Sequence, residues 1–167
     1  MPGPTDDYFV YKRWFQAGHG ALTLPANCAE PEPPTLSYSD QYTWSVEWYL
    51  ILASPDAYIR IFENFAKRSR MLLSRRIHFA YHYGPLIRKD DDGRPDRQAS
   101  DPVVVRIDNV GSAAHLHPEN DPTAHIPQGR IQGLNLESLD LFDFVKAAFR
   151  HRTNGTAIER TLGYRIL

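Results

Sequence analysis

The stretch that decides the fold is Trp44–Leu52, with the sequence WSVEWYLIL. Aromatic and branched side chains dominate it, and Trp44, Val46, Trp48 and Leu50 recur at every second position. Because successive side chains of a β-strand point to opposite faces, this spacing predicts a strand with one buried face. The fold is therefore expected to be built on a β-sheet.

Three further stretches have the same alternation, namely Tyr58–Phe65, Arg76–Tyr83 and Val103–Asn109. The Ser-Pro turn before the first of them would also suit the start of a helix. In the stretch Tyr58–Phe65, however, apolar residues alternate with Arg60 and Asn64, and this favours a strand. The sequence thus predicts four strands in succession.

A helix is predicted over Ser138–Arg152, where Leu141, Phe144, Val145 and Ala148 fall on one side and an Asn-Gly pair follows as a stop. Strands joined by turns, followed by a helix able to cover one face, predict an α+β fold. The expected architecture is an antiparallel four-stranded meander covered by a C-terminal helix.

The chain has 167 residues, of which 42% are hydrophobic, and this suits a single domain over residues 1–167. We expect an N-terminal helix or extended proline-rich segment in 1–43 and the antiparallel sheet in 44–109. A His-rich loop is expected in 110–137 and the C-terminal helix in 138–153.

Cys28 is the only cysteine, so the chain can form no internal disulfide and no cysteine-based zinc site. This favours a reducing compartment. The first residues lack the pattern of a signal peptide, and no apolar run reaches the length of a membrane span. We therefore expect a cytoplasmic protein with no membrane partner.

The most distinctive stretch is His115–Pro127, HLHPENDPTAHIP, which holds three of the seven histidines and three prolines. Proline excludes a helix here, so an irregular loop at the end of the sheet is expected. An imidazole has a pKa of about 6.5, so each ring can exchange protons or bind a transition metal near neutral pH.

Metal-independent cleavage of RNA needs a base, an acid and a cation for the charge that grows on phosphorus. The histidines offer the acid and the base, Arg106 can hold the phosphate, and Asp108 can orient one imidazole. Tyr81 or His82 can contribute from the neighbouring strand. The predicted catalytic set is His115, His117, His125, Arg106, Asp108, Tyr81 and His82, with no cofactor.

Two alternatives use the same stretch. If His115 and His117 lie in an extended segment, their side chains share one side of it, and with His125 they form a three-histidine site for zinc or another divalent transition metal. This would be a metal-dependent hydrolase. The other alternative is a non-catalytic accessory protein of a mobile-element or defence operon that docks a partner through the loop.

The formal net charge of -1 gives no overall attraction for nucleic acid, so RNA binding would need a local basic patch. Such a patch is predicted in the segment that contains Lys67, Arg68, Arg70, Arg75 and Arg76. The alternative is that these charges form an ordinary solvated surface.

The segments 79–84, 105–109 and 115–127, followed by a helix, resemble the TumE-like toxins of bacterial type II toxin–antitoxin modules. These carry a Tyr-His-Tyr or Tyr-His-Trp strand, an Arg-Tyr-Asp-Asn strand and a His-rich segment. The resemblance implies a ribonuclease-type toxin with a helix-turn-helix antitoxin as partner, and it marks the catalytic set above. The chain departs from the pattern where residues 110–114 separate the Asn from the histidines. The oligomeric state is not predicted.

Overall fold

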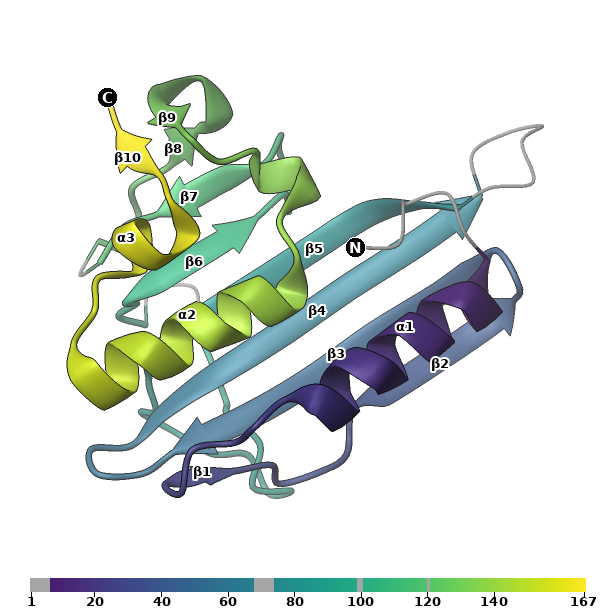
Figure 1. Cartoon of the computed structure of the whole chain (residues 1–167), viewed down its shortest axis with the longest axis horizontal. Coiled ribbons are helices and arrows are strands. Elements are labelled where there is room, and N and C mark those ends of the chain that lie inside the picture. The colour runs from purple at the N-terminus through teal and green to yellow at the C-terminus, as the bar shows by residue number, and fades with distance from the viewer. Residues whose placement is uncertain (1–6, 68–73, 99–100, 120) are drawn as a thin grey trace.

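A computed structural model describes residues 7–67, 74–98, 101–119 and 121–167. These residues form an α+β fold in which an eight-stranded antiparallel sheet carries its helices on one face (Figure 1). The predicted fold class is confirmed, and the sheet is larger than predicted.

The four predicted strands are present and pair in chain order: β3 (Thr43–Leu52), β4 (Ala57–Lys67), β5 (Ser74–Pro85) and β6 (Val105–Asp108). Short strands extend both sides of this meander. On one side β1 (Cys28–Ala29) and β2 (Thr35–Asp40) both pair with β3, and on the other β7 (His115–His117) and β8 (Ile126–Pro127) continue from β6.

The helices are α1 (Tyr8–Ala21), α2 (Leu141–Asn154) and α3 (Ile158–Leu162), and β9 (Ile131–Gln132) pairs with β10 (Arg165–Ile166). The helix predicted near the C-terminus begins later than expected, because Asp140 caps it by accepting a hydrogen bond from the Phe142 N–H. It ends at the predicted Gly155, which is left-handed. None of the helices among the described residues is long and apolar enough to cross a membrane.

The core lies between the sheet and helices α1 and α2 (Figure 1). Every second residue of β3, starting from Trp44, is buried, as the alternation predicts. Phe142 of α2 joins the two helices, since its ring lies 5.2 Å from the ring of Trp14 and 5.5 Å from that of Phe15. Neither of these helices covers the opposite face of the sheet (Figure 1).

A buried polar cluster lies within this core. Arg76 donates a hydrogen bond of 2.8 Å to Glu63, and their side chains are 3% and 0% exposed. The hydroxyls of Tyr11 and Tyr81 also donate to Glu63. Burial, followed by the charge of Glu63, raises the pKa of both phenols well above the ordinary value. The Glu63 charge is thus neutralised by Arg76 and solvated by two protonated tyrosines.

Arg76 reaches the core through an irregularity in β5. Asn64 pairs with His78 but Phe65 pairs with Arg76, so Ile77 is an extra residue in the strand. The shift reverses the alternation, which leaves Ile77 43% exposed and turns Arg76 inward. The guanidinium of Arg76 is therefore not part of a basic surface that could hold RNA.

We predict that Arg76→Met lowers the free energy of unfolding by about 3–5 kcal/mol, because it leaves the carboxylate of Glu63 buried without its cation. Urea denaturation measures the change. The adjacent Arg75 is exposed, so Arg75→Met serves as the matched control and should stay within about 0.5 kcal/mol of the parent. Equal stabilities for the two variants would contradict the structural role of Arg76.

Candidate functional site

The candidate site is built on the face of the sheet opposite the helices. Strand pairing places Arg60 of β4, His82 of β5, Arg106 of β6 and His117 of β7 in one cross-strand row. Side chains that are directly opposite on neighbouring antiparallel strands share a face. A second row, two residues along β6, contains Asp108 and its partner His115 on β7.

The structure differs from the predicted loop at His115–His117, which form strand β7 against β6. Leu116 between them is 1% exposed and packs into the core. Since side chains alternate along a strand, the burial of Leu116 turns both histidines to the opposite face. Proline excludes a helix here but permits this short strand, in which His115 and His117 are buried.

Three imidazoles converge at this end of the sheet. One ring nitrogen each from His115, His117 and His125 lies within 4.8 Å of the other two. The ring of His125 stacks on that of His115, with centroids 4.5 Å apart, and meets His117 edge-on at 4.4 Å. His125 alone of the three is exposed. Its partial desolvation and its proximity to His117 and His115 lower its pKa below the ordinary value, which favours the uncharged ring.

Backbone carbonyls hold the two buried rings in place. Nδ1 of His115 lies 2.9 Å from the carbonyl oxygen of Ala113, and Nδ1 of His117 lies 2.8 Å from that of Pro122. A carbonyl only accepts, so each Nδ1 carries the proton and donates it. The Nε2 atoms then face the carboxylate of Asp108, at 3.3 Å from His115 and 3.5 Å from His117.

Asp108 is the acidic centre of the cluster. Its Oδ2 lies 2.8 Å from Nε of Arg106, whose Nη2 lies 2.6 Å from Nε2 of His117. Burial acts to raise the pKa of Asp108, but its contacts with His117, His115 and Arg106 outweigh the effect of burial. The pKa is therefore below the ordinary value, and the carboxylate is ionised at neutral pH.

His82 lies beside this cluster and carries no charge at neutral pH. Its ring stacks on Tyr58 with centroids 4.8 Å apart, and its Nδ1 accepts a hydrogen bond of 2.9 Å from Nε of Arg97. Burial, followed by the charges of Arg97 and Arg106, lowers the pKa of His82 well below the ordinary value. One cavity of about 310 Å³ is lined by His82, Arg97, Arg106, His115 and His125.

The structure brings together most of the predicted catalytic set: His115, His117, His125, Arg106, Asp108 and His82. It does not bring Tyr81 to them. Tyr81 follows the alternation of β5 to the core face, where it is 0% exposed and bonded to Glu63. Its place in the predicted set is therefore not supported by its position.

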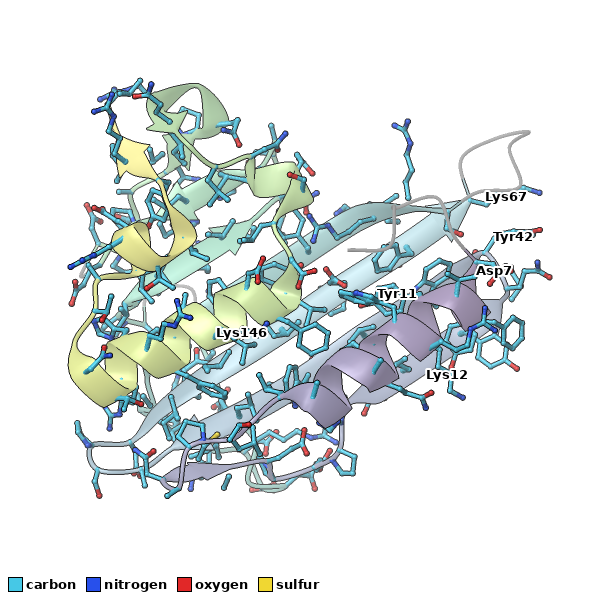
Figure 2. The ribbon with its side chains drawn as sticks, viewed as in Figure 1. Asp7, Tyr11, Lys12, Tyr42, Lys67 and Lys146 are labelled. Atoms are coloured by element: carbon cyan, nitrogen blue, oxygen red, sulfur yellow. The ribbon has the colours of Figure 1, made fainter. Side chains whose placement is uncertain are left out.

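The predicted basic segment lies apart from the histidines. Lys67 is exposed at the end of β4, where its Nζ lies over the ring of Tyr42, at the opposite end of the sheet from β7 (Figures 1 and 2). Arg75 is exposed and Arg76 is buried. Arg68 and Arg70 lie outside the described residues.

Two residues of the site were not predicted. Arg60 alternates with apolar residues of β4, and pairing β4 with β5 places it beside His82. That signal is present in the sequence. Arg97 comes from the long connection between β5 and β6 and has no local pattern that marks it. This connection is tied to the proline-rich segment by Arg94, which donates to Glu32 at 2.8 Å.

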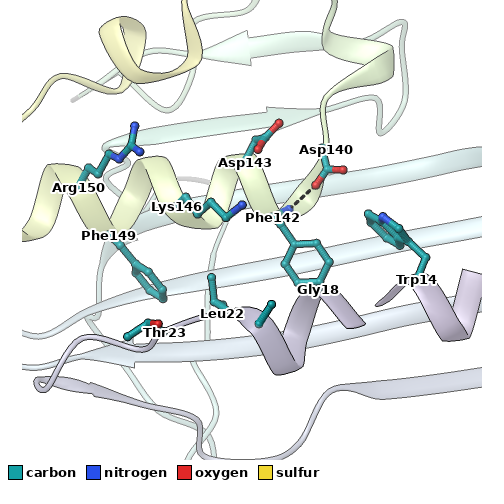
Figure 3. A pocket seen from close by; sticks show the side chains of 11 residues that line it. Trp14, Gly18, Leu22, Thr23, Asp140, Phe142, Asp143, Lys146, Phe149 and Arg150 are labelled. Atoms are coloured by element: carbon teal, nitrogen blue, oxygen red, sulfur yellow. Dashed lines mark hydrogen bonds between the residues drawn. The ribbon is translucent and has the colours of Figure 1, made fainter. Parts of the chain in front are cut away.

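A larger cavity of about 550 Å³ lies between α1 and α2, away from the histidines. Figure 3 shows Trp14, Phe142 and Phe149 beside it, with Lys146 and Arg150 on its α2 side. It contains none of the predicted catalytic residues. The described histidine cluster therefore remains the stronger candidate for chemistry.

We predict that His115 and His117 are both Nδ1–H tautomers in the metal-free protein at about pH 8, where ordinary imidazoles are neutral. The hydrogen bonds to Ala113 and Pro122 require this form. Long-range ¹⁵N–¹H spectra of the side chains identify the tautomer, with the exposed His78 as reference. Finding the Nε2–H form at either ring would contradict the geometry described.

Comparison of the chain with family models, with curated proteins and with solved structures gives no match. The resemblance to TumE-like toxins consequently rests on the short motifs alone. The function has to be argued from the geometry of the histidine cluster and its surroundings.

Proposed function

We propose that the chain is a metal-dependent hydrolase in which His115, His117 and His125 bind one divalent transition metal ion. The observation that carries this proposal is the convergence of three ring nitrogens within 4.8 Å, on three rings of which two are also held by a hydrogen bond from Nδ1 to a backbone carbonyl. Zinc is the ion that such sets most often bind in catalytic sites.

The distances suit a metal with little rearrangement. A Zn–N bond of about 2.0–2.1 Å places tetrahedral nitrogen ligands about 3.4 Å apart. His125 is exposed, so a small rotation of its side chain closes the remaining gap. Carbonyl acceptors on the second ring nitrogen are the usual way in which metal-binding histidines are oriented.

The cluster already attracts a cation. Nη2 of Arg106 lies 2.6 Å from Nε2 of His117, and Nε of the same guanidinium lies 2.8 Å from Oδ2 of Asp108. If His117 bound a metal ion through Nε2, the ion would take the place of this donor, and the ionised Asp108 would balance part of its charge. The guanidinium of Arg106, which lines the cavity, would then be available to a ligand there.

Three histidine ligands would leave one position of a tetrahedral ion open for water, and the metal would supply a lowered pKa of that water, about 7 in catalytic zinc sites. In hydrolysis the water oxygen forms the new bond to the electrophilic atom, the bond to the leaving group breaks, and a proton ends on the leaving group. Asp108 is close enough to the rings to hold that proton in transit. The adjacent cavity provides room for the substrate.

The second candidate function is metal-independent cleavage of RNA by a cytoplasmic toxin that an antitoxin restrains. The contacts of Arg106 with His117 and Asp108 favour it, because they combine a phosphate-binding cation with an oriented imidazole. The stacking of His125 on His115 favours metal binding over metal-independent cleavage. An acid and a base must act on the leaving and attacking oxygens, on opposite sides of phosphorus, and two rings 4.5 Å apart leave no room between them.

We predict that untagged protein binds about one equivalent of Zn²⁺ or Co²⁺, measured by elemental analysis and by the visible spectrum of the cobalt form. His125→Ala should weaken binding by more than about 100-fold, because it removes a ligand. His125 is exposed, so the variant should fold. His78→Ala, at an exposed histidine of β5, is the control and should bind like the parent. Unchanged metal binding in His125→Ala would refute the proposed ligand set.

We predict that zinc-loaded protein hydrolyses activated p-nitrophenyl esters, that a chelator abolishes the activity and that added Zn²⁺ restores it. The same preparations are incubated with single-stranded RNA. RNA cleavage that persists in the chelated protein and disappears in His117→Ala would support the second candidate and contradict the first. Coexpression with the neighbouring open reading frame then tests whether a partner restrains growth inhibition.

A further inference from the structure

The cavity beside the histidines carries an excess of positive charge. Among the described residues, its lining contains three guanidinium groups, from Arg60, Arg97 and Arg106, and one carboxylate, from Asp108. Arg106 is paired with Asp108, and Arg60 is paired with Glu47 at 3.1 Å. Two of the three charges are therefore compensated by carboxylates.

Arg97 has no such partner. Its Nε donates to the neutral His82, and no carboxylate among the described residues forms an ion pair with it. The side chain is partly buried, and burial together with the charges of Arg106 and Arg60 lowers its pKa. Holding a cation in this position costs free energy, and an anion in the cavity would recover that cost.

The contact with His82 also sets the orientation of Arg97. His82 is 2% exposed and stacked on Tyr58, so its Nδ1 is a fixed acceptor. This bond uses only Nε, and no other hydrogen bond joins Arg97 to a residue that the structure describes, so the two terminal amino groups of the guanidinium are available to another ligand. A pair of amino groups in a fixed plane matches two oxygens of a phosphate group.

We infer that this cavity binds the phosphate group of a small phosphorylated molecule, with Arg97 as the main contact and Arg60 and Arg106 on its sides. The inference rests on the proposed function, since it names the substrate class of the same site. A volume of about 310 Å³ accommodates a small molecule and is at the lower end of the range for ligand pockets.

The arrangement also fits the proposed chemistry. His115 and His125, two of the three proposed metal ligands, line the same cavity as Arg97. A phosphate group held there would lie beside two of the residues proposed to hold the metal. The uncompensated charge of Arg97, together with a metal ion, would offset the charge of the phosphate group and of the oxygens that gain charge during hydrolysis.

The test measures binding of inorganic phosphate to metal-free protein by isothermal titration calorimetry. Arg97→Gln should weaken binding roughly 10- to 100-fold, which corresponds to the loss of charge-assisted hydrogen bonds. Lys89→Gln removes one exposed positive charge from the same connection without touching the cavity, and it should bind phosphate like the parent. Equal binding by Arg97→Gln and the parent, or an equal loss in both variants, would overturn the inference.

Two further arms separate this inference from the proposed function. In the chelated parent, which holds no metal, phosphate binding should persist, so failure of the hydrolase proposal does not affect the result. In the zinc-loaded parent, p-nitrophenyl phosphate should be a better substrate than p-nitrophenyl acetate, and Arg97→Gln should raise its KM. Binding of a short single-stranded RNA with no binding of inorganic phosphate would contradict a small-molecule pocket.

Discussion

The antiparallel register of β6 and β7 is the constraint on which the candidate site depends. It places Asp108 opposite His115 and Arg106 opposite His117, all on one face. A slip of one residue would turn both histidines into the core and expose Leu116. Full burial of a leucine is worth about 1.5–3 kcal/mol, so packing on one face of β7 holds the chemical groups on the other. The positions of the site residues are therefore fixed by hydrophobic contacts on the opposite face of the sheet, in which the site residues take no part.

The parts of the fold and site that follow from period-two alternation could be predicted from the sequence. Alternation placed Trp44 on a buried face, and the same spacing separates His82 from Tyr81 and separates Arg106 and Asp108 from Ile107. It could not predict β7, because three residues between prolines and small residues carry too little pattern. It failed at Arg76, where one extra residue in β5 reverses the faces. Arg97 depends on a contact between distant parts of the chain, which no local pattern encodes.

Charge is distributed unequally between the two faces of the sheet. On the core face, Glu63 has Arg76 as cation and two tyrosine hydroxyls as donors, so the cluster is complete and stabilises the fold. On the other face, the hydrogen-bond partner of the Arg97 guanidinium within the described part of the chain is a neutral imidazole. A complete cluster needs no further ligand, whereas an uncompensated one gains free energy when an anion binds. This asymmetry distinguishes a structural network from a binding site more clearly than the residue types do.

The same alternation shows which residues of the toxin-like motif bear on function and which bear only on the fold. In the Tyr-His-Tyr segment of β5, Tyr81 and Tyr83 are buried on the core side and His82 belongs to the opposite face. A strand with helices on one face and polar side chains on the other tends to alternate aromatic and polar residues. The two tyrosines of the segment therefore reflect packing against the helices and do not indicate a function. The informative part of the resemblance is the polar subset on one face. In this chain Arg97, which lies outside the motif segments, joins the same face, and the three histidines are close enough to share one ion. The chemistry is therefore determined by which side chains the sheet gathers on one face.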